Sequence, residues 1–368
     1  MKKLLILLLC LAPVLAGLPR LYTQRREAEH LRLAETMGLD PAPEGLRLSL
    51  AAPGGGEEEP LFASAPGASV NLAMEALRQQ AGGEQLFCGH LQHILLGEAY
   101  ARQGLESLLS AVCRSSDLRL DMPVYLILGA EAGEAMAALD DGKAGVCDAL
   151  NSLGQRKNAG LSSAGRILRD LDRQGSALIR ALRLETSGDG DEERHSLVPA
   201  GCGVLADGRL RALLEPEEAL AAELLAGELR PSLLLLRDGQ GRRVTLELQE
   251  GRTRLQPVWD GDGKLVGLEI RAEVQAAVLE IEGFEQAADP RTLNEITARM
   301  EAELTRRIVR VLRLSGELEA DFLGLGRRLE LLSPLRGRGL GRDLGGLLPG
   351  LALRVTVRGE LRHSNDMN

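Results

Sequence analysis

The sequence predicts an α+β protein of more than one domain, in which mixed sheets are packed with helices. In the first half, apolar runs of strand length alternate with helical patterns, which indicates an N-terminal α/β domain over residues 21–190, with two subdomains as an open alternative. In the second half, short strands precede one long amphipathic helix. This order favours a C-terminal α+β domain over residues 191–365, an antiparallel-rich sheet packed on that helix.

Residues 1–20 have the charge and length of an export signal or membrane anchor. Lys2 and Lys3 precede an apolar run from Leu4 to Leu18, and no second apolar stretch approaches membrane-spanning length. Three fates remain open for this segment. Cys10 ends a lipobox-like run and is a lipidation site, or the signal is cleaved after Ala16, or the segment stays uncleaved with its lysines held inside.

The N-terminal domain begins with strand patterns. Two alternating stretches, Leu31–Leu33 and Leu46–Leu50, flank a turn rich in proline and predict a strand pair. The glycines and glutamates of Pro53–Pro60 predict a solvated, mobile loop. Further elements are expected as a helix capped by Ser69 and reaching Gln80, a buried strand over Leu86–Leu96, a helix over Glu98–Val112, a strand over Val124–Leu128 and a helix over Ala132–Leu139.

A domain boundary is predicted at Ser187–Arg194, where Gly, Asp and Glu crowd together without an apolar residue. The sequence is equally compatible with a further domain break near Pro231 or Pro290 and with no such break, so two and three domains both remain open. The helix from Thr292 to about Leu314 carries one core-facing stripe. Strands are expected around Gly203–Leu205, over Val244–Leu248, Leu265–Ile270 and Ala277–Ile281, and finally over Leu353–Val357.

Composition restricts the function classes. The net charge of −9 argues against a nucleic-acid or anionic-lipid surface, because both need clustered Lys and Arg. Aromatic residues are 2% of the chain, which removes the stacking platforms of sugar and single-strand binders. The cysteines after the N-terminal segment have no CxxC spacing, and buried free thiols are favoured over disulfides, which an exported chain also allows. These cysteines are Cys88, Cys113, Cys147 and Cys202.

No catalytic motif or cofactor fingerprint is found, so the sequence predicts neither an enzyme nor a cofactor. Cys88, His90 and His93 come closest to a metal site, but on a strand the third side chain faces away from the first two. Asp260 and Asp262 begin like a calcium loop that lacks its later oxygen ligands, so a hairpin turn is expected. The arginines of the long helix predict a solvated face, with an acidic partner as the alternative. They are Arg299, Arg306, Arg307 and Arg310.

Several short motifs follow one another from about Arg25 to Gly359. They are Arg25-Arg26-Glu27 with Gly38-Leu39-Asp40, Phe87-Cys88-Gly89-His90-Leu91 with Gly97-Glu98, Ala101, Gly104 and Arg114, then Gly201–Leu205 with Asp207–Leu210, and Asp321–Gly326 with Pro334. In this order they resemble the motifs of the Ger(x)C family, the C subunits of bacterial spore nutrient germinant receptors. At two places the sequence departs from the family pattern: Leu21 and Tyr22 stand where the family has its lipidated Cys, and Leu335 and Arg336 stand where a Trp is common.

The resemblance implies a non-enzymatic, membrane-tethered subunit on the outer face of the spore inner membrane. It would act in nutrient-triggered germination through contacts with an integral-membrane A subunit and a permease-like B subunit. The alternative is an exported solute-binding protein that delivers a small nutrient to a transporter. No catalytic residue carries over, and the motif positions are expected to have structural roles: Gly38, Asp40, Gly89, His90, Gly97, Glu98, Arg114, Asp321, Gly324 and Gly326.

Overall fold

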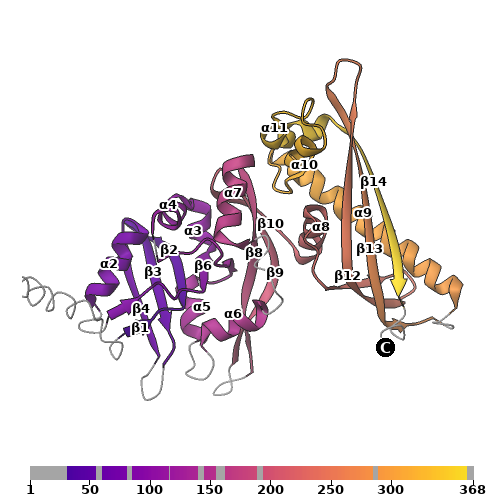
Figure 1. Ribbon diagram of the computed structural model, residues 1–368. Coiled ribbons are helices and arrows are strands. Elements are labelled where there is room, and N and C mark those ends of the chain that lie inside the picture. The colour runs from indigo at the N-terminus through magenta and orange to yellow at the C-terminus, as the bar shows by residue number, and fades with distance from the viewer. Residues whose placement is uncertain are drawn as a thin grey trace, which may run out of the picture.

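The computed structural model describes residues 31–54, 60–80, 85–115, 117–139, 145–154, 162–188, 194–284 and 289–362. It has an eight-stranded mixed sheet and a four-stranded sheet, which lie side by side with helices packed on each (Figure 1). The predicted α+β class is therefore confirmed. The N-terminal segment, with Cys10 and Ala16, lies outside the described residues, as does most of the predicted loop at 53–60.

The eight-stranded sheet has the strand order β10-β9-β8-β7-β6-β2-β3-β4. Its central strands pair in parallel, and the strands toward both edges are antiparallel hairpins. The central strands β6 and β7 are buried along their whole length, which explains their continuous apolar sequence. The bounds are β2 Thr36–Ala42, β3 Gly45–Ala52, β4 Leu61–Gly67, β6 His93–Gly97, β7 Val124–Leu128, β8 Ser176–Ser187, β9 Arg194–Ala206 and β10 Arg209–Leu214.

Helices cover both faces of this sheet and form two core layers with it. The larger layer contains α2, α3, α4 and α7, and the smaller one contains α5 and α6. A helix on each face is what a sheet with buried parallel strands requires. The bounds are α2 Val70–Gln80, α3 Glu98–Gln103, α4 Glu106–Arg114, α5 Ala132–Leu139, α6 Val146–Gly154 and α7 Ala164–Gln174.

The four-stranded sheet has the order β11-β12-β13-β14, antiparallel except for the parallel pair β13–β14. The long helix α9 packs on it through a buried stripe that includes Ile296, Met300 and Leu304. The predicted antiparallel-rich sheet on one long helix is confirmed. The bounds are α8 Pro216–Ala226, β11 Ser232–Arg237, β12 Arg243–Trp259, β13 Leu265–Glu282, α9 Pro290–Glu317, α10 Leu325–Leu332, α11 Leu340–Leu347, the 3-10 turn η4 Leu348–Gly350 and β14 Ala352–Arg362.

Three predictions in the first half were wrong. The stretch Leu86–Leu96 is not one strand but β5 (Gln85–Phe87) and β6, because the chain turns between Cys88 and Leu91 with a hydrogen bond from Leu91 N to Cys88 O at 3.1 Å. β5 pairs in parallel with β1 (Leu31–Leu33), so the partner of β3 is β2 instead. The helix expected over Glu98–Val112 is divided at Gly104, whose φ of +137° is not helical.

The C-terminal half also differs from the prediction. The two short strands expected over Leu265–Ile270 and Ala277–Ile281 are parts of one strand, β13, of 18 residues. β8 and β9 pair across the predicted boundary at Ser187–Arg194, and the first sheet continues through β10, so below we call the part of the chain built on the first sheet the N-terminal domain and the part built on the second sheet the C-terminal domain. The chain therefore passes to the second sheet through α8, after Leu214.

Candidate functional site

Asp40, at the end of β2, holds the first turn of α5. Its Oδ1 accepts a hydrogen bond from Ala132 N–H at 2.7 Å, and its Oδ2 accepts one from Gly133 N–H at 2.8 Å. The side chain is buried, and this burial raises the pKa of the carboxyl although both backbone donors lower it. The motif aspartate of the first domain is therefore a helix cap between elements about 90 residues apart in sequence.

Asp321 does the same for α10 in the second domain. Its Oδ1 accepts from Leu325 N–H at 3.0 Å and its Oδ2 from Gly326 N–H at 2.6 Å. Asp321 is 1% exposed, and burial raises its pKa to about 7. Gly324 precedes the helix with a φ of +68°, a left-handed conformation that favours glycine.

Three motif glycines are needed because other groups occupy the space of a side chain. A Cβ at Gly97 would lie 2.1 Å from Asp40 Oδ1, and one at Gly38 would lie 2.6 Å from Met136 Sδ on α5. A Cβ at Gly326 would lie 2.0 Å from the carbonyl oxygen of Leu340, where α11 begins. These glycines and the two aspartates form two compact helix-anchoring clusters.

The remaining motif residues lie apart from these clusters. A Cβ at Gly89 would lie 2.6 Å from the ring of Phe87. His90 has a half-exposed side chain, with Nε2 3.6 Å from a carboxylate oxygen of Glu35. Glu98 opens α3 and binds Arg102 at 2.7 Å within the same helix. Arg114 ends α4 and is exposed.

His93, not His90, is the buried histidine of this region. Its Nε2 lies 3.0 Å from Asn151 Oδ1, and burial lowers its pKa, so the ring is neutral at pH 7. In the part of the chain that the structure describes, no group of three His, Cys, Asp or Glu could hold a metal ion.

The four cysteines of the described residues are free thiols, of which Cys88, Cys147 and Cys202 are buried and Cys113 is exposed. Burial raises the pKa of the Cys147 and Cys202 thiols to about 12. The prediction of buried free thiols is confirmed for three of them.

The calcium-like sequence at Asp260 is a hairpin turn, in which Asp260 Oδ1 accepts from the backbone N–H of Asp262 and Lys264 at 3.0 and 2.8 Å. The arginines of α9 form ion pairs within the chain. Arg299 binds Asp238 at 2.7 Å, Arg306 and Arg307 each bind Glu303 at 2.6 Å, and Arg310 binds Glu218 at 2.6 Å.

Ion pairs and backbone contacts join the two domains. Arg166 on α7 binds Glu228 at 2.6 Å, and Arg180 on β8 binds Glu223 on α8 at 2.7 Å. Arg342 on α11 donates to the carbonyl oxygen of Asp172 at 2.9 Å. A cavity of about 490 Å³ lies at this junction, between Arg180, Glu223 and their neighbours. Sequence reasoning missed this junction, because its arginines lie on two helices and a strand that are far apart in sequence, and Arg180 alternates with apolar residues as on any half-buried strand.

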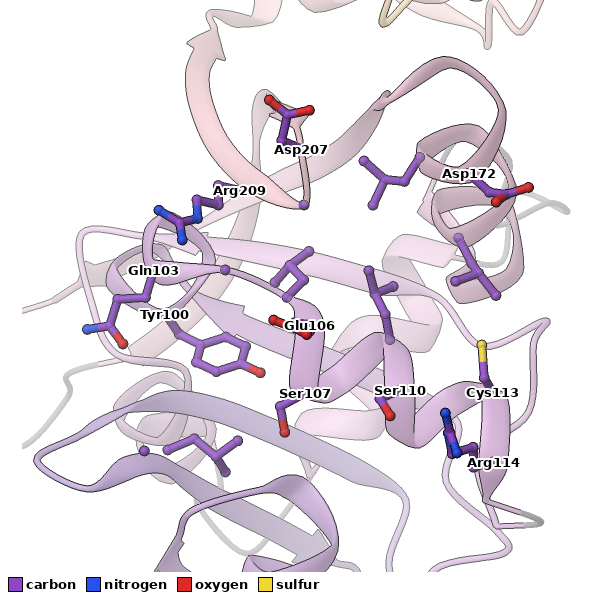
Figure 2. Close-up of a pocket in the computed structure, with 18 of the residues that line it drawn as sticks. Tyr100, Gln103, Glu106, Ser107, Ser110, Cys113, Arg114, Asp172, Asp207 and Arg209 are labelled. Carbon is purple, nitrogen blue, oxygen red and sulfur yellow. The ribbon is translucent and has the colours of Figure 1, made fainter. Parts of the chain in front are cut away.

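A larger cavity, of about 850 Å³, opens within the N-terminal domain. In Figure 2, labelled side chains of α3 and α4 line it on one side, and Asp172, Asp207 and Arg209 lie at its opposite rim. Tyr100 is 4% exposed, and its hydroxyl has no hydrogen-bond acceptor among the described residues. Burial raises the pKa of Tyr100 to about 12. The cavity is therefore lined by charged groups of both signs next to a buried phenol, and its volume is within the range of small-molecule sites.

Within the described ranges no helix combines the length and apolar character needed to cross a membrane. Asp40 and Asp321 anchor helices. The four α9 arginines named above, and Arg166 and Arg180 at the junction, form ion pairs within the chain. Neither feature brings together a nucleophile and a base.

Comparisons with known proteins identify the family. Residues 24–179 match the family described as "Spore germination protein N-terminal domain", and residues 200–336 match "Spore germination B3/ GerAC like, C-terminal". A solved structure described as "Crystal Structure of the GerBC protein" has a TM-score of 0.58 and 15% identity, covering 88% of this chain and 96% of that chain, which is a likeness of fold. No curated protein matches the chain. Because the two family matches follow one another over most of the sequence, the chain belongs to the spore germination GerAC-like family, also called Ger(x)C.

Proposed function

We propose that the chain is the C subunit of a spore germinant receptor and acts in nutrient-triggered germination without a reaction of its own. It would do so through contacts with an integral-membrane A subunit and a permease-like B subunit. The observation that carries the proposal is the pair of spore-germination family matches over residues 24–179 and 200–336.

The roles of the motif residues support a binding function. Asp40 and Asp321 use both carboxylate oxygens on backbone N–H groups, so neither is available to a substrate. Gly38, Gly97 and Gly326 make room for neighbouring groups. The family pattern therefore maintains the shape of two domains, and a protein of this kind acts through the surfaces that the shape presents.

The proposed location is the outer face of the spore inner membrane, where residues 1–20 would hold the chain by lipidation at Cys10 or as an uncleaved anchor. Mass spectrometry of the mature N-terminus distinguishes these attachments from cleavage after Ala16. A mature chain that begins at Gly17 and is released from membranes by salt alone would refute the tether.

The decisive test is deletion of the gene followed by a germination assay. Spores without the chain should fail to lose optical density after nutrient addition, yet should germinate with a chemical trigger that bypasses nutrient receptors. Reintroduction of the wild-type gene should restore the response, and the chain should copurify with A and B subunits from spore membranes. Unchanged germination to every nutrient, in a strain without paralogues, would contradict the proposal.

The cavity in Figure 2 supports the second candidate, a solute-binding protein that delivers a nutrient to a transporter. The cavity lies within one domain, on α3, α4 and α7, instead of between two lobes joined by crossing strands. Calorimetric titration with amino acids, sugars and nucleosides tests this candidate. Micromolar binding that is lost in Tyr100→Phe would support it over the first proposal.

A further inference from the structure

Three leucines at the end of α10 are exposed together. Leu331, Leu332 and Leu335 are 70%, 58% and 97% exposed, and Leu335 is the most exposed large apolar side chain among the described residues. We call residues 331–338 the leucine loop. Scattered single leucines are normal on a protein surface, but three within five positions form a patch that calls for a partner.

The leucine loop is held in a fixed conformation. One carboxylate oxygen of Glu330 accepts hydrogen bonds from Gly339 N–H and Gly341 N–H, both at 3.0 Å. Within the loop, Gly337 N–H donates to Ser333 O at 2.7 Å, and Gly337 is buried where a side chain would clash with that carbonyl. The leucines therefore project from a turn that is held by hydrogen bonds, and not from an unstructured segment.

α10 itself is fastened to the domain. Arg328 donates to Leu225 O at the end of α8 and to Thr253 O on β12, both at 2.5 Å. On its buried side the helix contributes Leu325 and Leu329 to the core. The leucine loop is thus a rigid projection of the C-terminal domain, next to α11 (Figure 1).

The charge around the loop is opposite to that of the chain. The chain has a net charge of −9, but residues 327–338 contain four arginines and one glutamate, and that glutamate is used by the backbone. Arg336 and Arg338 are exposed beside Leu335, and Arg327 is partly exposed. None of these three arginines forms an ion pair with a described residue. The overall charge disfavours an anionic-lipid surface, but here Arg is clustered.

We propose that the leucine loop is a membrane contact that inserts its leucines into the interface of an anionic phospholipid bilayer while its arginines bind the headgroups. Apolar tips flanked by basic residues suit the boundary between headgroups and acyl chains. The three side chains offer roughly 400 Å² of apolar surface, about half of what one partner contributes to a standard protein interface. A small, projecting, basic patch fits a bilayer better than a protein groove.

The inference rests on the proposed membrane attachment and extends it. A single tether at the N-terminus holds the chain near a bilayer but leaves its body free to rotate. One weak contact is reversible, whereas two contacts together give stable attachment. The leucine loop would therefore orient the C-terminal domain on the membrane.

Depth-dependent fluorescence quenching tests the contact. The full chain is prepared in a Trp259→Phe background, which removes its single tryptophan, and carries Leu335→Trp. It is bound to phosphatidylglycerol vesicles that contain doxyl-labelled lipid. The control is Leu72→Trp, since Leu72 on α2 is 58% exposed, as Leu332 of the leucine loop is, but belongs to the other domain. We expect several-fold stronger quenching at position 335 than at position 72.

The charge requirement is tested in the same vesicles. Arg336→Glu with Arg338→Glu should lower the quenching at position 335 at least twofold, and vesicles of phosphatidylcholine alone should do the same. Two results would overturn the inference and leave the tether intact, provided that the chain still floats with the vesicles. One is equal quenching at positions 335 and 72, and the other is quenching at position 335 that charge reversal does not change. A chain that does not float refutes the tether and this contact together.

A protein partner gives a different outcome. If position 335 is not quenched in protein-free vesicles but becomes shielded from a soluble quencher when A and B subunits are present, the leucine loop docks on protein. That result would also overturn the inference.

Discussion

Asp321 offers the sharpest test of the helix-anchor reasoning. Replacement by alanine removes the cap of α10 and leaves the N–H groups of Leu325 and Gly326 buried without an acceptor. Loss of an N-cap costs about 0.5–2 kcal/mol, and a buried unsatisfied donor costs about 1–3 kcal/mol. Because the two effects overlap, we expect Asp321→Ala to lower the free energy of unfolding of the C-terminal domain by about 2–4 kcal/mol.

Trp259 makes this measurable. It is the only tryptophan, lies at the end of β12 and packs against the core of the C-terminal domain, so its fluorescence during urea unfolding reports that domain. Ser163→Ala is the matched control. It removes a cap in the other domain, where Ser163 Oγ accepts from Arg166 N–H at 3.2 Å. The urea concentration at the midpoint of the unfolding that Trp259 reports should therefore not change.

The raised pKa of Asp321 also predicts the direction in which its contribution to stability changes with pH. Burial raises its pKa in the folded protein to about 7, from 3.8 in an exposed carboxyl. Between these values the folded state binds a proton that the unfolded state has lost, so the contribution of Asp321 to the free energy of unfolding falls as pH rises from about 4 to about 7, by at most about 1.4 kcal/mol per pH unit. The difference in free energy of unfolding between wild type and Asp321→Ala should therefore be larger at pH 5 than at pH 8.

Two results would refute the reasoning. Surface substitutions change the free energy of unfolding by up to about 0.5 kcal/mol. If Asp321→Ala changes the value reported by Trp259 at pH 5 by no more than that, the cap is not needed. A gap that grows from pH 5 to pH 8 would show that the carboxyl acts in its ionised form and that its pKa is not raised.

Three further predictions concern other buried groups. Gly326→Ala should lower the free energy of unfolding by several kcal/mol because its Cβ would meet the Leu340 carbonyl, whereas Gly346→Ala, with open space around it, should not, as paired urea titrations would show. Among the cysteines of the described residues, Ellman's reagent should label Cys113 in the native protein and Cys88, Cys147 and Cys202 only after unfolding, so fast labelling of these three would contradict the structure. Burial lowers the pKa of His93, so the free energy of unfolding should decrease as pH falls below about 6.5, and thermal melts of a His93→Gln variant should lose part of this dependence.

Elements with a strong local pattern were predictable from the sequence. The bounds of β7 and α5 agree with the expected Val124–Leu128 and Ala132–Leu139, because an apolar run and a short helix were each bounded by turn residues. The long helix α9 followed from its stripe of apolar residues. The break at Gly104 and the turn at Gly89 were missed, because the apolar periodicity continues across both glycines.

The candidate site could be predicted only in part. The family motifs marked Asp40 and Asp321, but the donors that Asp40 binds are more than 90 positions away, and no local pattern indicates them. The cavity around Tyr100 combines residues from α3, α4, α7 and β10, so it exists only once the sheet order is known. In the leucine loop, the sequence marked Leu335 and Arg336 only as a departure from the family pattern, because the leucines have the spacing of an ordinary core stripe.

β14 is the last strand of its sheet, and among the described residues its outer edge has no pairing strand. Such an edge, 11 residues long, is a template on which a second molecule could add a strand and begin aggregation. Arg354, Arg358 and Arg362 are exposed along it at every fourth position. Two copies brought edge to edge would bring these guanidinium groups close to one another, so like-charge repulsion would oppose self-assembly through this edge.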